Sequence, residues 1–121
     1  MQVKKSMARA LRELGVAENT LSPEEKAQFD SNGFLVVGQL LSSDQAAVMR
    51  AQLDALVLKE GEDAGRDFQQ EKGSVILGTL LDKEAMFDVC CLHPRVLSAV
   101  AHAMGDDFGL SSLSARTPLP G

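Results

Sequence analysis

The hydrophobic pattern of the chain is dominated by a period of three to four residues, which is typical of amphipathic helices. The first stretch with this pattern runs from Met1 to Leu14, and Gly15 is placed to end it. Its first twelve positions hold four basic residues and no acidic one. We interpret residues 1–20 as a basic amphipathic helix at the periphery, followed by a linker. The alternatives are a mitochondrial presequence and a helix that lies on a membrane surface.

Two further helices are predicted to begin with capping boxes, in which two residues three apart bind each other's backbone N–H groups. Ser22 and Glu25 form the first, with Pro23 at the first helical position, and Gly33 ends that helix. The second box lies in "SSDQ" and opens a longer helix over 42–61. The apolar residues along one side of this helix are Ala46, Met49, Leu53, Leu56 and Val57.

Helical periodicity returns in the second half of the chain. Asp82 is predicted to cap a helix that runs through Met86, Phe87 and Cys90. His93 and Pro94 start another helix, which Gly105 ends. The residues predicted on the buried side of that last helix are Val96, Leu97, Val100, Ala101 and Met104.

Three short segments have the character of strands. Residues 34–37, "FLVV", form an uninterrupted apolar run, which predicts a strand buried on both faces. Residues 75–77 are a shorter candidate, and residues 108–116 alternate before Pro118 ends them. The polar segment 61–73 holds three glycines and is predicted to be a loop, either mobile or held by another part of the protein. This order of elements predicts an α+β fold, mostly helical with a few short strands.

Composition and charge exclude several classes of function. The net charge is −5, and the basic residues of the first twelve positions leave the remainder more acidic still, so it repels phosphate backbones. Phenylalanine supplies all five aromatic residues, too few for a base-stacking surface, and we expect no nucleic-acid partner. No apolar run approaches the ~20 residues of a membrane span. The adjacent Cys90 and Cys91 suit a reducing compartment, which predicts a cytoplasmic protein.

The residues that most often bind metals or catalyse reactions do not form a convincing site in the sequence. His102 and Asp106 are four apart but lack a third ligand, so we interpret His102 as a surface residue near a helix C-terminus. His93 is interpreted as a partly packed helix start. The two cysteines lack Cys-x-x-Cys spacing and are interpreted as one core residue and one at its margin. The acidic residues that lack the spacing of a calcium loop, and are assigned to a solvated loop, are Glu60, Glu62 and Asp63.

Two segments together resemble a known family. They are "FDSNGFLVVGQLLSSDQAAVMRAQLDAL" (29–56) and "LHPRVLSAVAHAMGDDFGLSSLSARTPLPG" (92–121). In this order and at about this spacing, they resemble the N-terminal part of the phytanoyl-CoA dioxygenase family, whose members are Fe(II)- and 2-oxoglutarate-dependent oxygenases. The resemblance covers residues 21–121. It implies the mostly helical N-terminal part of a double-stranded β-helix, or jelly-roll, oxygenase domain.

The resemblance also implies where the iron ligands of such a domain lie. In the family, a strand with His-x-Asp follows the proline-rich turn and supplies two ligands, and a distant histidine supplies the third. Neither His93 nor His102 is followed two residues later by an acidic residue. We therefore expect residues 21–121 to be truncated before the iron-binding strand. Fe(II), 2-oxoglutarate and the small-molecule substrate then belong to the complete domain, and none is expected to bind this chain.

Three residues near the end of the sequence are candidates for the pocket of that domain. Ser112, Ser114 and Arg116 alternate and share one face of the predicted strand. By resemblance, this strand borders the pocket for 2-oxoglutarate and substrate, where the guanidinium of Arg116 suits a carboxylate. Arg116 is equally well read as a charge that protects an edge strand from aggregation.

The sequence thus predicts the N-terminal fragment of a small-molecule hydroxylase, inactive alone. The alternative is a non-catalytic binding or regulatory module that pairs with another chain through its strand edges. Self-association of the isolated chain is also predicted, because several apolar surfaces lack a barrel to meet. These surfaces are Leu110, Leu113 and the apolar faces of 46–57 and 96–104.

Overall fold

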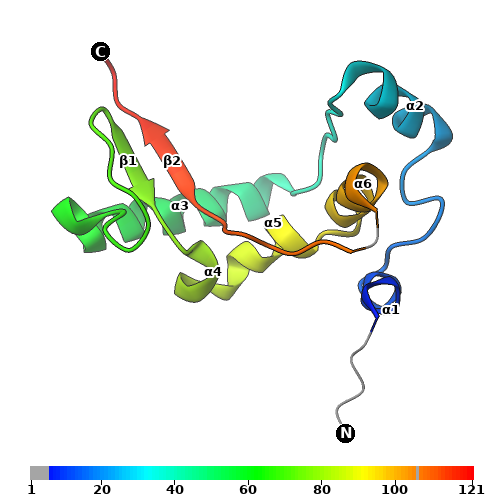
Figure 1. Ribbon diagram of the computed structural model, residues 1–121. Helices are drawn as coiled ribbons and strands as arrows, with labels where there is room; N and C mark the ends of the chain where they lie inside the picture. The colour runs from blue at the N-terminus through cyan, green and yellow to red at the C-terminus, as the bar shows by residue number, and fades with distance from the viewer. Residues whose placement is uncertain (1–5, 106) are drawn as a thin grey trace, which may run out of the picture. The chain divides into compact units, whose positions relative to one another are not determined.

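The computed structural model describes residues 6–105 and 107–121 and has an α+β fold, as predicted (Figure 1). The helices are α1 (Met7–Glu13), α2 (Pro23–Asn32), α3 (Ser43–Glu60), α4 (Leu80–Lys83), α5 (Val89–Leu92) and α6 (Pro94–Met104). Two 3-10 turns, η1 (Gly61–Asp63) and η2 (Ala85–Asp88), and two strands, β1 (Ser74–Leu77) and β2 (Ala115–Pro118), complete the described elements.

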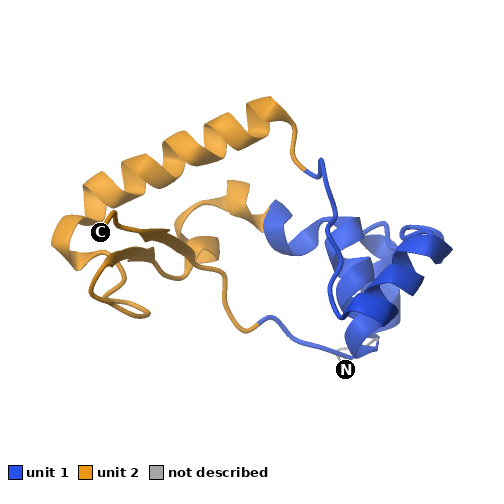
Figure 2. Ribbon diagram, turned by 90° about the horizontal axis from the view of Figure 1, so that it is seen from above, with its two compact units in different colours: residues 1–40, 89–110 blue, residues 41–88, 111–121 orange. Residues whose placement is uncertain are grey.

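The chain divides into two compact units, coloured separately in Figure 2. Unit 1 consists of Met1–Leu40 and Val89–Leu110, and unit 2 of Leu41–Asp88 and Ser111–Gly121. Each unit is therefore built from two segments that are distant in sequence. Residues 1–20, predicted to be a peripheral helix and linker, belong to the first segment of unit 1.

Unit 1 contains the helices whose ends the sequence marks most clearly. The Ser22 hydroxyl accepts from the Glu25 backbone N–H at 3.1 Å, and the Glu25 carboxylate accepts from the Ser22 backbone N–H at 2.8 Å, which confirms the capping box of α2. Gly33 closes α2 in the left-handed conformation, at φ 76°. In α1 the first described cap is Ser6, and the part of the predicted basic helix over residues 1–5 lies outside the described residues.

Helix α6 starts at the predicted position. The ring Nδ1 of His93 accepts from the Arg95 backbone N–H at 3.2 Å, and Pro94 occupies the first turn. The predicted buried side is right for Leu97, which is 8% exposed, but wrong for Met104, which is 65% exposed at the end of the helix. The buried apolar residues of unit 1 are Leu11, Leu21 and Leu97.

The predicted strand at residues 34–37 is wrong. This segment is irregular, and Phe34 and Val36 are 63% and 81% exposed. A strand needs a neighbour to pair its backbone N–H and C=O groups, and β1 and β2 pair only with each other among the described residues. Phe34 and Val36 stay in solvent, whereas Leu35 and Val37 are half-buried.

Unit 2 has a core between α3 and the antiparallel β1–β2 ribbon, whose two strands are distant in sequence. Helix α3 and the ribbon lie alongside each other in Figure 1. Its buried residues are Leu56, Leu77, Leu80 and Phe87. Half-buried apolar residues packed against them include Met49, Leu53, Val57, Leu113 and Ala115. The apolar side predicted for α3 is therefore confirmed for the residues from Met49 onward, whereas Ala46 is exposed.

The helix predicted to follow an Asp82 cap is wrong. Asp82 lies inside α4, and the chain continues through η2 into α5 instead of forming one helix. Thr79 precedes α4 with φ 45°, and Glu84 ends it in an extended conformation. The break turns Phe87 into the core of unit 2, where its side chain is 1% exposed.

Candidate functional site

The β1–β2 ribbon and the segment before β2 carry the three residues predicted to line a pocket. The strand predicted over 108–116 is wrong in extent, because β2 begins only at Ala115, so Ser112 and Ser114 lie in the irregular segment before it. The predicted alternation is nevertheless seen: Ser112, Ser114 and Arg116 are exposed, and the residues between them are half-buried. All three residues are thus exposed to solvent, two before β2 and one within it.

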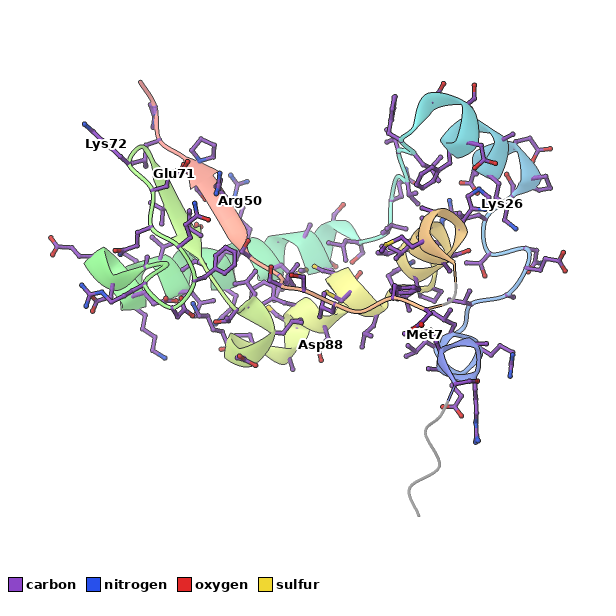
Figure 3. All side chains as sticks on the ribbon, in the orientation of Figure 1. Met7, Lys26, Arg50, Glu71, Lys72 and Asp88 are labelled. Carbon is purple, nitrogen blue, oxygen red and sulfur yellow. The ribbon has the colours of Figure 1, made fainter. Side chains whose placement is uncertain are left out.

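Arg116 already binds a carboxylate. Its Nη1 lies 3.0 Å from Oε2 of Glu71, and both side chains are about half exposed. Glu71 belongs to the loop that precedes β1 and is labelled in Figure 3 beside the β1–β2 ribbon. The pair shows that the guanidinium is oriented to bind a carboxylate, and a ligand carboxylate there competes with Glu71.

A small hollow adjoins this ion pair. It has a volume of about 180 Å³ and is lined by residues of the loop and of β1, among them Gln70, Glu71 and Ser74. Pockets for drug-sized ligands measure roughly 300–1,000 Å³. The hollow therefore accommodates a group of a few atoms and does not form a substrate pocket by itself.

The two outer edges of the β1–β2 ribbon differ in what lies beside them. The Leu119 backbone N–H donates to Gly73 O at 2.8 Å, so in this register the pairs Ser74–Pro118 and Ile76–Arg116 direct their backbone groups outward. Pro118, predicted to end the strand, is accommodated as its last residue because its missing N–H faces away from β1.

The outer edge of β1 is covered, whereas that of β2 is open. Gly65 lies so close to the Ile76 carbonyl that a Cβ at residue 65 would come within 2.9 Å of the oxygen. No strand lies on the outer side of β2 within the described parts of the chain. Among the described residues, neither edge has a further strand, and the loop lies against that of β1 at Gly65.

The loop over 61–73 is held by a cluster of charged side chains. Lys83 Nζ lies 2.9 Å from Oε1 of Glu60 and 3.4 Å from Oδ2 of Asp67, and the Lys83 and Glu60 side chains are only 16% and 20% exposed. The Thr79 hydroxyl donates to Asp67 Oδ2 at 2.5 Å. The assignment of Glu60 to a solvated loop is therefore wrong, because this residue ends α3 and forms a largely buried ion pair.

The electrostatics of the cluster follow from these contacts. The hydrogen bond from Thr79 lowers the pKa of Asp67; burial opposes this change, and Lys83 supports it. Asp67 is thus kept ionised beside Lys83. The sequence contains no signal for the cluster, since its contacting side chains are 12 to 23 residues apart in sequence and none is part of a recognisable motif.

An ion pair of similar design holds unit 1 together. Arg95 of α6 pairs with Glu25 of α2 and also donates to the Thr20 carbonyl at 2.8 Å. The hydrogen bond from Arg95, together with the one from the Ser22 backbone N–H, lowers the pKa of Glu25 below its ordinary value of 4.5. The pair links two helices that are 70 residues apart in sequence.

The Glu25–Arg95 pair predicts a pH dependence of stability. Because the pKa of Glu25 is lower in the folded state, its stabilising contribution is complete above about pH 4.5 and is lost as the pH falls through the folded-state pKa. Glu25→Gln should lower the urea midpoint at pH 7, and the difference from the wild type should shrink toward about pH 3. The exposed neighbour Glu24 provides the control, as Glu24→Gln should follow the wild-type curve. A difference that stays constant with pH would refute this role.

A second, shallow hollow lies in unit 1. It has a volume of about 580 Å³, and its lining includes Ala17, Glu18 and Lys26. Lys26 Nζ donates to the Glu18 carbonyl at 2.9 Å. The lining contains no histidine or cysteine to accompany Glu18, so the hollow has no arrangement typical of acid–base or nucleophilic catalysis.

The histidines and cysteines do not form a metal site. His93 caps α6 as predicted, and His102 Nε2 lies 2.7 Å from Asp30 Oδ1 with its ring edge-on to Phe29. Cys90 and Cys91 are free and half-buried, and burial, together with the neighbouring Cys91, raises the pKa of Cys90. Asp106, the predicted neighbour of His102, lies outside the described residues.

The described residues do not fit an iron centre. No three His, Cys, Asp or Glu side chains within 6–105 and 107–121 converge on a point where a metal ion could bind. Of the predicted set, Arg116 is the residue with an ion pair among the described residues, to the carboxylate of Glu71.

In the part of the chain that the structure describes, no helix has the length and apolar character needed to cross a bilayer. Comparison with known proteins identified no matching family model, no matching curated protein and no matching solved structure.

Proposed function

We propose that residues 21–121 form the N-terminal part of an Fe(II)- and 2-oxoglutarate-dependent dioxygenase domain that hydroxylates a small molecule. The observation that carries the proposal is the two-stranded β1–β2 ribbon, whose β2 edge has no neighbouring strand among the described residues. A two-stranded ribbon needs packing against a helix or further strands to be stable in water. Here α3 packs on the ribbon, and β2 is the edge to which we assign the further strands. In the proposal, the strands of the jelly roll continue from this edge.

The exposed row of Ser112, Ser114 and Arg116 supports the same proposal. Arg116 holds a carboxylate oxygen of Glu71 at 3.0 Å, and Ser114 precedes it on the exposed side. In the complete domain, this row would border the pocket, and a carboxylate of 2-oxoglutarate would replace Glu71. The iron ligands would come from His-x-Asp or His-x-Glu on another part of the protein, and the 121 residues alone would be inactive.

The open edge also supports a second candidate function. A non-catalytic module would use the outer side of β2 to bind an extended segment of another protein, with main-chain hydrogen bonds for affinity. Both candidates are placed in the cytoplasm, where the two free cysteines remain reduced. They differ in whether the strand beyond β2 belongs to the same polypeptide.

The intact mass of the protein produced by its natural gene separates the two candidates. The dioxygenase proposal predicts a mass well above the 12.9 kDa of these residues and a His-x-Asp or His-x-Glu motif in the additional sequence. A product of 12.9 kDa, or a longer one without this motif, would eliminate the oxygenase and leave the binding module.

A further inference from the structure

Helix α3 is apolar on two opposite sides. One side carries Met49, Leu53 and Leu56 and packs on the core of unit 2. The residues of the opposite side are all exposed; they are Ala47, Val48, Ala51, Ala55 and Leu58, and we call them the outer stripe. Val48 and Leu58 are 58% and 85% exposed.

The spacing makes the outer stripe a continuous surface. Ala47, Ala51, Ala55 and Leu58 follow one another at intervals of four, four and three, so they lie on one face of the 18-residue helix. A surface helix normally carries polar residues opposite its buried apolar face, so an apolar row there is unusual. Isolated apolar residues on a surface are ordinary, but an aligned row suggests a binding partner.

Charged residues flank the stripe. Arg50 and Asp54 are four apart along one side, and Asp44 and Lys59 lie near its two ends. All four are exposed, and none has an ion pair with another described residue. Figure 3 labels Arg50 on α3. The helix therefore presents two opposite charges on the same flank, both available to a partner.

We propose that the outer stripe binds the outer stripe of a second copy of this chain, with the two α3 helices antiparallel about a two-fold axis. An axis at the level of residues 51 and 52 brings Ala51 of the two copies together and places Ala47 of each copy near Ala55 of the other. The small side chains allow close approach of the helices, and Leu58 then covers Ala47 of the second copy.

The same axis matches the charges. It places Arg50 of each copy opposite Asp54 of the other, and Asp44 opposite Lys59, and symmetry repeats each pair. A parallel two-fold pair would instead place the Arg50 and Asp54 flanks of the two copies on opposite sides of the interface, where they do not meet. Because both the apolar and the charged positions of the stripe complement themselves in the antiparallel arrangement, the stripe fits a second copy of this chain.

This inference does not rest on the proposed function. The outer stripe lies on the side of α3 opposite to the face that packs on the β1–β2 ribbon. It therefore differs from the apolar face on which self-association was predicted from the sequence. A single pair of helices buries less than the roughly 1,200–2,000 Å² of a stable complex. The dimer is consequently expected to dissociate on dilution.

Sedimentation equilibrium of the 121-residue chain over a range of concentrations tests the surface. The wild type should change from monomer to dimer, and Ala51→Glu should raise the dimer Kd at least about tenfold, because it places two carboxylates at the axis. Ala46→Glu is the matched control, since Ala46 is exposed on the same helix outside the stripe and its substitution should leave Kd unchanged. A monomer at all concentrations, or a dimer that Ala51→Glu leaves intact, overturns the proposal.

A charge exchange tests the antiparallel two-fold arrangement. Arg50→Glu alone puts two carboxylates together at each symmetry-related position and should raise Kd by about tenfold. The double variant Arg50→Glu, Asp54→Lys restores opposite charges and should return Kd to near the wild-type value. Equal helicity of the variants in circular dichroism ensures that folding is retained. Failure of the second change to restore dimerisation rules out this arrangement.

Discussion

Gly65→Ala is expected to lower the free energy of unfolding of unit 2 by about 2–4 kcal/mol. Residue 65 has φ +81°, and its Cβ would lie 2.2 Å from the Gln69 carbonyl oxygen and 2.9 Å from that of Ile76. The left-handed backbone costs a non-glycine residue about 1 kcal/mol, and overpacking against fixed backbone atoms adds about 1–3 kcal/mol. Urea unfolding followed by circular dichroism measures the change.

Gly73→Ala is the matched control for this prediction. Gly73 has nearly the same φ, +84°, and nothing within 4 Å of its Cβ position. Its replacement should therefore cost only the backbone strain, about 1 kcal/mol. The excess measured for Gly65→Ala reports the close approach of residue 65 to the carbonyl oxygens of Gln69 in the loop and Ile76 in β1. Equal losses for the two variants would mean that residue 65 does not lie this close to them.

Phe87→Ala is expected to have the other large effect, a loss of about 3–5 kcal/mol. The Phe87 side chain is 1% exposed in the core that α3 forms with the β1–β2 ribbon, and its removal leaves a cavity lined by leucines. This loss would be a large part of the roughly 5–15 kcal/mol by which a folded domain is typically stable. Thermal and urea unfolding of the purified variant measure it.

Phe34→Ala provides the comparison for Phe87→Ala. Phe34 is 63% exposed, so its removal should change the stability by no more than about 0.5 kcal/mol. The sequence pattern alone predicts a buried strand at this position and hence a large loss. A cost for Phe34→Ala close to that of Phe87→Ala would contradict the observed exposure of residues 34–37.

The features that the sequence predicts well are those that depend on near neighbours. The capping box of α2 joins residues only three apart, and His93 caps α6 through a bond to Arg95, two residues away. The closing glycines, such as Gly33 with φ 76°, depend on the local backbone. These elements form as predicted because a few consecutive side chains determine their geometry.

The features that it misses depend on distant partners. An apolar run such as 34–37 becomes a strand only if another strand pairs with it, and β2 is shorter than predicted because β1 offers four residues for pairing. The cluster of Lys83, Glu60 and Asp67 joins three separate segments, so no periodicity indicates it. For the candidate site, the sequence predicts that Ser112, Ser114 and Arg116 share one face, but not that they are exposed or that Arg116 binds the carboxylate of Glu71.

The most direct test of the proposed function is the visible absorption of the natural gene product with Fe(II) and 2-oxoglutarate in the absence of oxygen. A 2-oxo acid chelated to Fe(II) gives a charge-transfer band, and succinate, which lacks the oxo group, serves as the control. The account predicts the band for the natural product and none for the 121 residues alone. A folded natural product that gives no band with saturating 2-oxoglutarate would contradict the assignment to an oxygenase.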